Sequence, residues 1–355
     1  MNDITILLTI YNRPYYTLRW LKYFISNNCP YKLYICDGGN DNELTNKIKK
    51  LTNQFNNIVY KKFQYYKNFE KFHEKFFQAT MEITSKYTFL SEDDDFVIFS
   101  NLKKLQDILD DNHEYSCAGG MNIELEQVNP LLSWKYYVLN TESNTDISYE
   151  EPTSELRCIQ SVKRTNSNYN CLHKTENLRE IFKYLYELNS NNLWITELIF
   201  ILMSAYFGKI KRVNFLTYIK TANIDISSSY AYFKYINIFT FMTSKNFAKD
   251  NYDIAQFLNN KDHGINKENL SKEININLSN FYKQIIIEYF YQNKIIHLIR
   301  SKMPLKKFIK YSYLILKYFK YSKISNILCK TSLSNQLLLK NNKEINFIIN
   351  FLNNN

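Results

Sequence analysis

The amino-acid sequence predicts an α/β protein of the Rossmann-like kind, with a mostly parallel sheet flanked by helices. Over the first 95 residues, apolar runs of strand length alternate with segments of helical periodicity, and polar clusters follow three of the apolar runs. Alternation of this kind is typical of a parallel sheet covered on both faces. Right-handed crossovers then bring the carboxyl ends of the strands to one edge, where ligands bind.

The first predicted strand is the near-continuous aliphatic and β-branched run at 4–10, as expected of a strand buried on both faces. Pro14 suits the first turn of the helix that follows, because a proline there loses no hydrogen bond. The second strand spans 32–36 and ends in a turn with two glycines. Residues 41–55 are predicted to form the next helix.

The third strand is predicted at 57–63, and an aromatic face at helical spacing predicts a helix over 69–83. The fourth strand begins at Tyr87 and ends at Asp93. The later elements expected from periodicity are a helix around 102–109, a strand at 115–121, a strand-like piece at 134–139, helices at 175–188 and 194–207, and a strand at 210–219. Beyond about residue 230 the pattern is helical.

Four consecutive acids, Glu92 to Asp95, follow the fourth apolar strand. Acids are buried only when they are paired or coordinate a metal, and carboxylate oxygens are ligands that suit Mg²⁺ and Mn²⁺. The alternative is a solvated acidic turn before a helix. Polar clusters at Thr9–Arg13 and Asp37–Gly39 also follow strands, and their expected convergence with the acids favours a cation site at the sheet edge.

Composition limits the class and location of the protein. A chain of 355 residues with 45% hydrophobic residues can form one large domain or two ordinary ones. Its six cysteines contain no C-x-x-C pair, which argues against a zinc knuckle or a thioredoxin-like site. The sequence shows neither a signal-peptide pattern nor an apolar run of membrane-spanning length, so we expect a cytoplasmic protein with reduced thiols.

The net charge of +11 is concentrated near the C-terminus, where residues 300–330 contain one Arg, eight Lys and no acid. Residues 305–320 place apolar side chains mainly on one helical face and lysines on another. Such a helix can lie on an anionic membrane, and the alternative is an ordinary helix with a solvated face. The expected location is therefore cytoplasmic, with peripheral attachment to the inner face of the cell membrane as an extension of that expectation.

Three motifs together resemble a known family. Thr9-Ile10-Tyr11-Asn12-Arg13 resembles the first-strand motif of GT-A glycosyltransferases of the family 2 type. Cys36-Asp37-Gly38-Gly39 is similar to their D-G motif, and Glu92-Asp93-Asp94-Asp95 to their D-x-D motif. The order and spacing of the motifs agree with that family over residues 3–122, and the resemblance extends weakly to about 220.

The resemblance implies a nucleotide-sugar donor and a Mn²⁺ or Mg²⁺ ion at the sheet edge. It places Thr9, Tyr11 and Arg13 in the nucleotide pocket and Asp37 against the base or ribose. Asp95 would ligate the cation that bridges the diphosphate, and Asp93 would lie near the ribose or the metal. The remaining positions assigned to donor binding are Asp94, Gly119 and Gly120.

An inverting transfer also needs a general base for the acceptor hydroxyl. In the family an acid follows an aromatic residue at a helix start, and Trp194-Ile195-Thr196-Glu197-Leu198 matches this loosely, with Leu198 where the family commonly has Asp. Glu197 is thus the candidate base, with a helix N-terminal acid favoured by the dipole as the alternative. Glu155 and Asp146 are the fallback candidates.

We therefore expect a GT-A catalytic domain at 1–225, followed by a mainly helical, basic region at 226–355. The expected reaction is metal-dependent transfer of a sugar, with inversion, to a glycan or lipid-linked acceptor in bacterial surface polysaccharide synthesis. One alternative is a nucleotidyltransferase that makes an activated sugar, although Tyr11–Pro14 lacks the expected glycine. Another is a basic nucleic-acid or membrane adaptor without chemistry, although we expect no nucleic acid partner.

Overall fold

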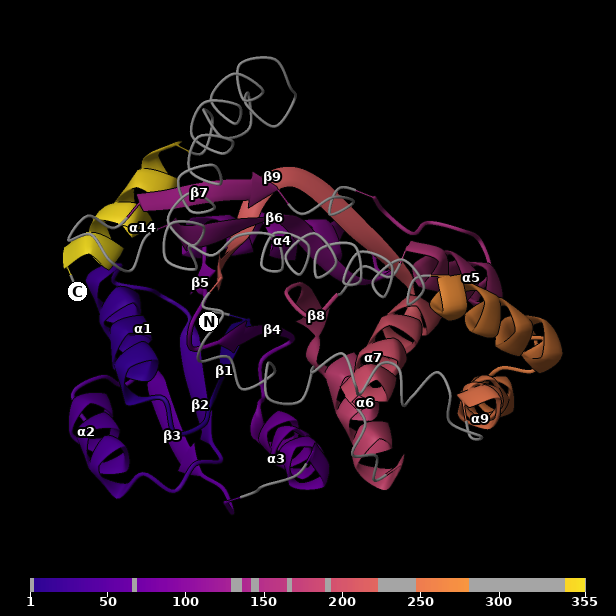
Figure 1. The fold of residues 1–355 in the computed structure, drawn as a ribbon, viewed down its shortest axis with the longest axis horizontal. Helices are drawn as coiled ribbons and strands as arrows, with labels where there is room; N and C mark the ends of the chain where they lie inside the picture. The colour runs from indigo at the N-terminus through magenta and orange to yellow at the C-terminus, as the bar shows by residue number, and fades with distance from the viewer. Residues whose placement is uncertain are drawn as a thin grey trace, which may run out of the picture.

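The computed structural model describes residues 3–65, 69–128, 136–141, 147–164, 168–188, 193–222, 247–280 and 342–354. Within these ranges nine strands form one sheet in the order β3-β2-β1-β4-β8-β6-β9-β5, and β7 pairs with β6 off this path. Helices lie on both sides of the sheet (Figure 1). The predicted α/β fold class is confirmed.

The element bounds follow the predicted pattern closely in the first third of the chain. The strands are β1 (Ile4–Ile10), β2 (Lys32–Asp37), β3 (Ile58–Lys62), β4 (Tyr87–Glu92), β5 (Phe96–Val97), β6 (Tyr115–Val128), β7 (Tyr136–Thr141), β8 (Leu172–Lys174) and β9 (Lys209–Ala222). The helices are α1 (Pro14–Ser26), α2 (Asn42–Thr52), α3 (Phe69–Glu82), α4 (Phe99–Asp111), α5 (Ser154–Arg164), α6 (Thr175–Leu188), α7 (Leu193–Phe207), α9 (Phe247–Lys261) and α14 (Asn342–Asn354).

The parallel half of the sheet positions the candidate site. Strands β3, β2, β1 and β4 are all parallel, and Thr9 of β1 is level with both Cys36 of β2 and Glu92 of β4. The next residue, Ile10, is level with Asp37. The three polar clusters therefore begin at one edge of the sheet, as the alternation of strands and helices predicted.

The other half of the sheet departs from the prediction. The short strand β8 lies between β4 and β6 and is antiparallel to both. Strands β6 and β9 are parallel to each other and longer than expected, with register shifts along their pairing. The predicted strands ended where the apolar residues end. In the structure, the backbone pairing between β6 and β9 continues beyond that point.

Each face of the sheet carries its own hydrophobic core. Alternate residues of β1 divide between the two, because Leu7 joins the cluster that includes α3, α5, α6, α7 and α9, while Ile6 and Leu8 join the cluster on the opposite face. That second cluster includes α1, α2 and α4 and the buried Ile348 and Leu352 of α14. Helix α14, yellow in Figure 1, lies beside α1.

The described parts of the C-terminal region are helical, as expected, and comprise α9, residues 267–280 and α14. The proposed boundary at 225 and the basic segment 300–330 lie outside the described residues. Of the helices in the described ranges, none has both the length and the hydropathy that a bilayer crossing requires.

Candidate functional site

The acidic run forms the turn between β4 and β5. Asp93 is fully buried, and its two carboxylate oxygens accept hydrogen bonds from Arg13 and from Thr17, whose Oγ1 lies 2.7 Å from Asp93 Oδ2. The Arg13 guanidinium also donates to Asp94, with 2.8 Å between Nη1 and Oδ2. One arginine at the start of α1 thus holds two acids of the turn.

The negative charges of Asp93 and Asp94 keep Arg13 in its charged form. Burial acts to lower the pKa of Arg13, but the negative charges of Asp93 and Asp94 outweigh it and raise that pKa above its ordinary value. Burial raises the pKa of Asp93 to about 6, and the Arg13 charge opposes the increase. The pair is therefore an ion pair of low hydration, in which each partner depends on the other.

Three of the acids form a compact group of oxygens. Glu92, Asp94 and Asp95 each place a carboxylate oxygen within 4.8 Å of the others. Asp95 is buried and accepts a hydrogen bond from the Thr221 backbone N–H at 2.9 Å, so its position is set by β9. Three carboxylates around one point are a donor set that suits Mg²⁺ or Mn²⁺.

Restricted hydration and the closeness of these acids raise the pKa values of Glu92 and Asp95. A bound cation would act in the opposite direction. The Glu92 side chain reaches solvent, but surrounding protein restricts its hydration, and this together with the neighbouring Asp94 charge raises the pKa of Glu92 to about 7, against the effect of Lys220. Burial, Asp94 and Glu92 together raise the pKa of Asp95 well above its ordinary value. A divalent cation among the three would lower these pKa values, so the residues present fit a metal ion.

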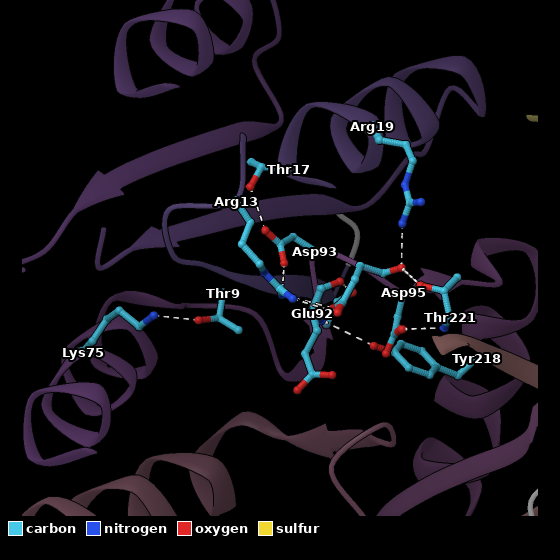
Figure 2. A network of polar contacts seen from close by, with 12 residues as sticks. Thr9, Arg13, Thr17, Arg19, Lys75, Glu92, Asp93, Asp95, Tyr218 and Thr221 are labelled. Carbon is cyan, nitrogen blue, oxygen red and sulfur yellow. Dashed lines mark hydrogen bonds and ion pairs between the residues drawn. The ribbon is translucent and has the colours of Figure 1, made fainter. Parts of the chain in front are cut away.

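The placement favours Glu92 over Asp93 as the partner of Asp95 in a metal site. Asp93, the predicted ligand, has both oxygens engaged by Arg13 and Thr17. Glu92 extends away from that pair (Figure 2) and belongs to the group of three oxygens. Arg13, far away in the sequence, binds the side chain that the D-x-D spacing suggested for the metal, and the metal role of Asp93 stays a prediction.

Asp37 lies buried at the end of β2, within a network of its own. Its carboxylate accepts hydrogen bonds from the Gly39 N–H at 2.8 Å, the Tyr60 hydroxyl at 2.7 Å and Lys62 Nζ at 2.7 Å. These contacts join the turn after β2 to β3. Asp37 thus shapes this part of the sheet edge, and its contact with a base or ribose stays a prediction.

The predicted nucleotide-pocket residues Thr9 and Tyr11 lie at the end of β1. Lys75 of α3 is buried and donates a hydrogen bond to Thr9 Oγ1 at 2.6 Å, which brings a positive charge to this strand end (Figure 2). The Tyr11 ring is nearly parallel to that of Tyr65, with centroids 5.9 Å apart. An aromatic pair and a lysine therefore adjoin the acids at the edge.

Glu197 of α7 lies within electrostatic range of Glu92, a member of the acidic group. Its side chain reaches solvent although its neighbours Thr196 and Leu198 are buried. Surrounding protein still restricts its hydration, which raises the pKa of Glu197 to about 7; the Glu92 charge adds to the increase and Lys220 opposes it. The two glutamates are thus close enough for their charges to interact.

The start of α7 is held in place by a buried contact. Thr196, which directly precedes Glu197, has its Oγ1 2.9 Å from Nε2 of His73 on α3. Of the fallback bases, Glu155 accepts hydrogen bonds from Asn266 N–H and Asn269 Nδ2, so it caps the 267–280 helix instead. Asp146 lies outside the described residues.

Gly119 and Gly120 are packed by the protein itself. A Cβ on Gly119 would lie 2.5 Å from Cys171 Sγ, and one on Gly120 would fall on the Phe215 carbonyl oxygen and lie 2.5 Å from Thr217 Cγ2. Contact of these two glycines with a donor stays a prediction. The close packing of β6 against β8 and β9 explains both residues.

We expect Gly120→Ala to lower the free energy of unfolding by about 2 kcal/mol, because the new methyl group meets backbone that cannot move aside easily. The measurement is the urea midpoint of the full chain. Gly264→Ala is the matched control, since its Cβ would meet only the Asp262 side chain, at 3.1 Å. Equal midpoints for the two variants would contradict the packing argument.

Sequence reasoning missed several residues of the site. These are Thr17, Arg19, Lys75, Lys220 and Thr221. A usable signal existed for Lys75 alone, because it occurs at helical spacing from Phe72 on an otherwise apolar face. The others are brought to the acids by tertiary structure.

The strand order and the acid run at the end of β4 agree with the arrangement that the motif resemblance to GT-A glycosyltransferases implies. Among solved structures, the chain is similar to residues 1–349 of S. aureus TarS, with 15% identity, coverage of 72% of this chain and 70% of that chain, and a TM-score of 0.42. It is also similar to that protein in complex with UDP (16% identity, TM-score 0.41) and with UDP-GlcNAc (13% identity, TM-score 0.39), covering 72% of this chain and 70% and 71% of those chains. No family model matches the chain, and a search of curated proteins finds no match. Likenesses of this size assign no ligand to this chain.

Proposed function

We propose that this protein is a metal-dependent glycosyltransferase that moves a sugar from a nucleotide-sugar donor to an acceptor hydroxyl. The observation that carries the proposal is the group of Glu92, Asp94 and Asp95 at the end of a parallel strand, with Arg13 on one side. Glu197 of α7 is close enough to this group for the charge of Glu92 to affect its pKa. The motifs at Thr9–Arg13 and Asp37–Gly39 lie along the same edge.

In this proposal Glu92, Asp94 and Asp95 hold the divalent cation. The chemistry that such a cation supplies when bound is stabilisation of negative charge on a leaving diphosphate. The chain's own contribution is to keep these acids in place, through Arg13 on Asp94 and through the Thr221 N–H on Asp95. Lys75 at the end of β1 and Lys220 near Glu92 supply positive charge that would favour a negatively charged donor.

Glu197 acts as the general base in the proposed reaction. A carboxylate with a pKa of about 7 is ionised in about half of the molecules at neutral pH and can accept the proton of an acceptor hydroxyl. Its side chain reaches solvent, which leaves it accessible to an acceptor. Attack by that hydroxyl from the Glu197 side, opposite the leaving group, would invert the sugar's configuration.

The finer parts of the proposal rest on the motif resemblance. We include a glycan or lipid-linked acceptor, a hexosyl donor and a role in bacterial surface polysaccharide synthesis on that ground. We include a cytoplasmic location on the same ground. Membrane attachment would depend on residues 300–330, which lie outside the described ranges.

The test is release of nucleotide from a panel of UDP-, GDP- and CMP-sugars with Mn²⁺, Mg²⁺ or EDTA. We expect slow donor hydrolysis with one donor class, loss of turnover in EDTA, and a decrease of at least 100-fold in Asp95→Asn. Asp107→Asn is the matched control, because it changes an acid that pairs with Lys103 on the exposed face of α4. Absence of both turnover and metal-dependent nucleotide binding would contradict the proposal.

A further inference from the structure

A second group of metal-ligating side chains lies in the sheet itself. Cys117 of β6, together with Cys171 and His173 around β8, places three ligand atoms within 4.8 Å of one another. All three side chains are buried. His173 is opposite Thr88 of β4, four residues before Glu92, which is about 13 Å along the strand, so this group is separate from the acidic site.

The strand register explains how the three meet. Cys117 is directly opposite His173 in the antiparallel β6–β8 pair, so their side chains lie on the same face. Cys171 is two residues before His173 and therefore shares that face. The same register puts Gly119 across from Cys171, where a Cβ would lie 2.5 Å from the sulfur. The absent side chain of Gly119 makes room for the Cys171 thiol.

The imidazole of His173 has the hydrogen-bonding and ionisation state that a metal-binding histidine needs. Its Nε2 lies 2.7 Å from the Asn168 backbone carbonyl oxygen, which can only accept, so Nε2 carries the hydrogen and Nδ1 keeps a lone pair. Metal-binding histidines typically donate their other ring N–H to a carbonyl in this way. Burial lowers the pKa of His173 to about 4, which keeps the ring neutral.

A positive charge lies beside the two thiols. Burial acts to raise the pKa of both Cys117 and Cys171, and the positive charge of Arg212 acts in the opposite direction on each. Arg212 is held at this place by Asn168, whose Oδ1 accepts a hydrogen bond from Nη2 at 2.9 Å. Asn168 thus orients both the histidine and the arginine beside the sulfurs.

We propose that Cys117, Cys171 and His173 form a binding site for a thiophilic metal ion of the zinc class. Two sulfurs and one imidazole nitrogen are ligands that Zn²⁺ prefers, and a tetrahedral ion would keep a fourth position for a non-protein ligand. Binding would release the thiol protons, because metal-bound cysteine is a thiolate. The bound ion would tie β6 to β8, and its presence does not depend on the proposed transferase function.

The test uses the full-length protein, freed of metal by a chelator and titrated with Co²⁺. We expect one equivalent to bind with the absorption band of thiolate-to-cobalt charge transfer, and Zn²⁺ to displace it. Cys117→Ser and Cys171→Ser should each weaken Zn²⁺ binding at least tenfold. Cys158→Ser is the matched control, a buried cysteine of α5 outside the group, and Asp95→Asn should also keep the site.

The wild-type titration decides the proposal even if a serine variant does not fold. Absence of the charge-transfer band, or binding that survives in folded Cys117→Ser and Cys171→Ser proteins, would overturn it. A Cys117–Cys171 disulfide found by mass spectrometry after peroxide treatment, in a protein that binds no Zn²⁺ when reduced, would assign the cluster to thiol redox chemistry and would also overturn the metal site.

Discussion

Glu197→Gln is expected to lower the kcat of nucleotide release by about 10²- to 10⁴-fold, because an amide cannot accept the acceptor proton. The affinity for the donor should change little, since Glu197 lies on α7 rather than on the strand ends that carry the donor motifs. Folding should be unaffected, because the side chain reaches solvent and the substitution removes a charge that Glu92 repels. The measurement is steady-state kinetics of the full chain with the donor that the panel identifies.

The pH profile gives a second readout of the same residue. The pKa of Glu197 is raised to about 7, and a base acts in its ionised form, so kcat should rise with pH through about 7 and then level. Glu197→Gln should lose that rising limb. Glu187→Gln, which changes an exposed acid of α6, should keep both the rate and the limb. A Glu197→Gln enzyme with more than one-tenth of the wild-type kcat would exclude Glu197 as the base.

Arg13→Ala is expected to lower the free energy of unfolding by about 3–5 kcal/mol, since it leaves the buried Asp93 without its cationic partner. Arg13→Lys should recover part of the lost stability, because it restores a positive charge beside Asp93. The recovery should be incomplete, because one ammonium group cannot bridge two carboxylates as a guanidinium does. Urea unfolding of each variant measures the effect.

Two further variants separate the buried pair from charge in general. Asp93→Asn in the Arg13→Ala background should regain stability, because it removes the uncompensated charge. Lys47→Ala breaks an exposed pair with Glu43 on α2 and should leave the midpoint unchanged. If Arg13→Ala unfolds at the wild-type midpoint, the Arg13–Asp93 pair does not stabilise the turn.

The parallel half of the fold was predictable because its strands are buried on both faces. Such strands are continuous apolar runs, and the bounds of β1 agree with the predicted range at 4–10. Strand β8 could not be found this way, since it has three residues and includes a histidine. This strand forms by pairing with β4 on one side and β6 on the other, and a local sequence pattern contains no information on such pairing.

The candidate site was predictable to the level of the strand end and not to the level of the side chain. The acid run identified the end of β4. It did not show which acid pairs with Arg13 or which acids form the group of three oxygens, because the position of Arg13 depends on where α1 starts. The cysteine–histidine group was missed for a similar reason. Cys117 joins Cys171 and His173 only through the antiparallel register of β6 and β8.

The contact of α14 with the first half of the chain has a consequence for synthesis on the ribosome. Phe351 packs against Tyr23 of α1 and against Phe96, the residue that follows the acidic turn. Ile348 and Leu352 complete the core that begins with Ile4. Chains emerge from the ribosome N-terminus first, so the core beneath the acidic turn stays open until residues 342–354 have been translated. We therefore expect nascent chains that end before α14 to expose this apolar surface to chaperones, and the site to mature only after residues 342–354 have been translated.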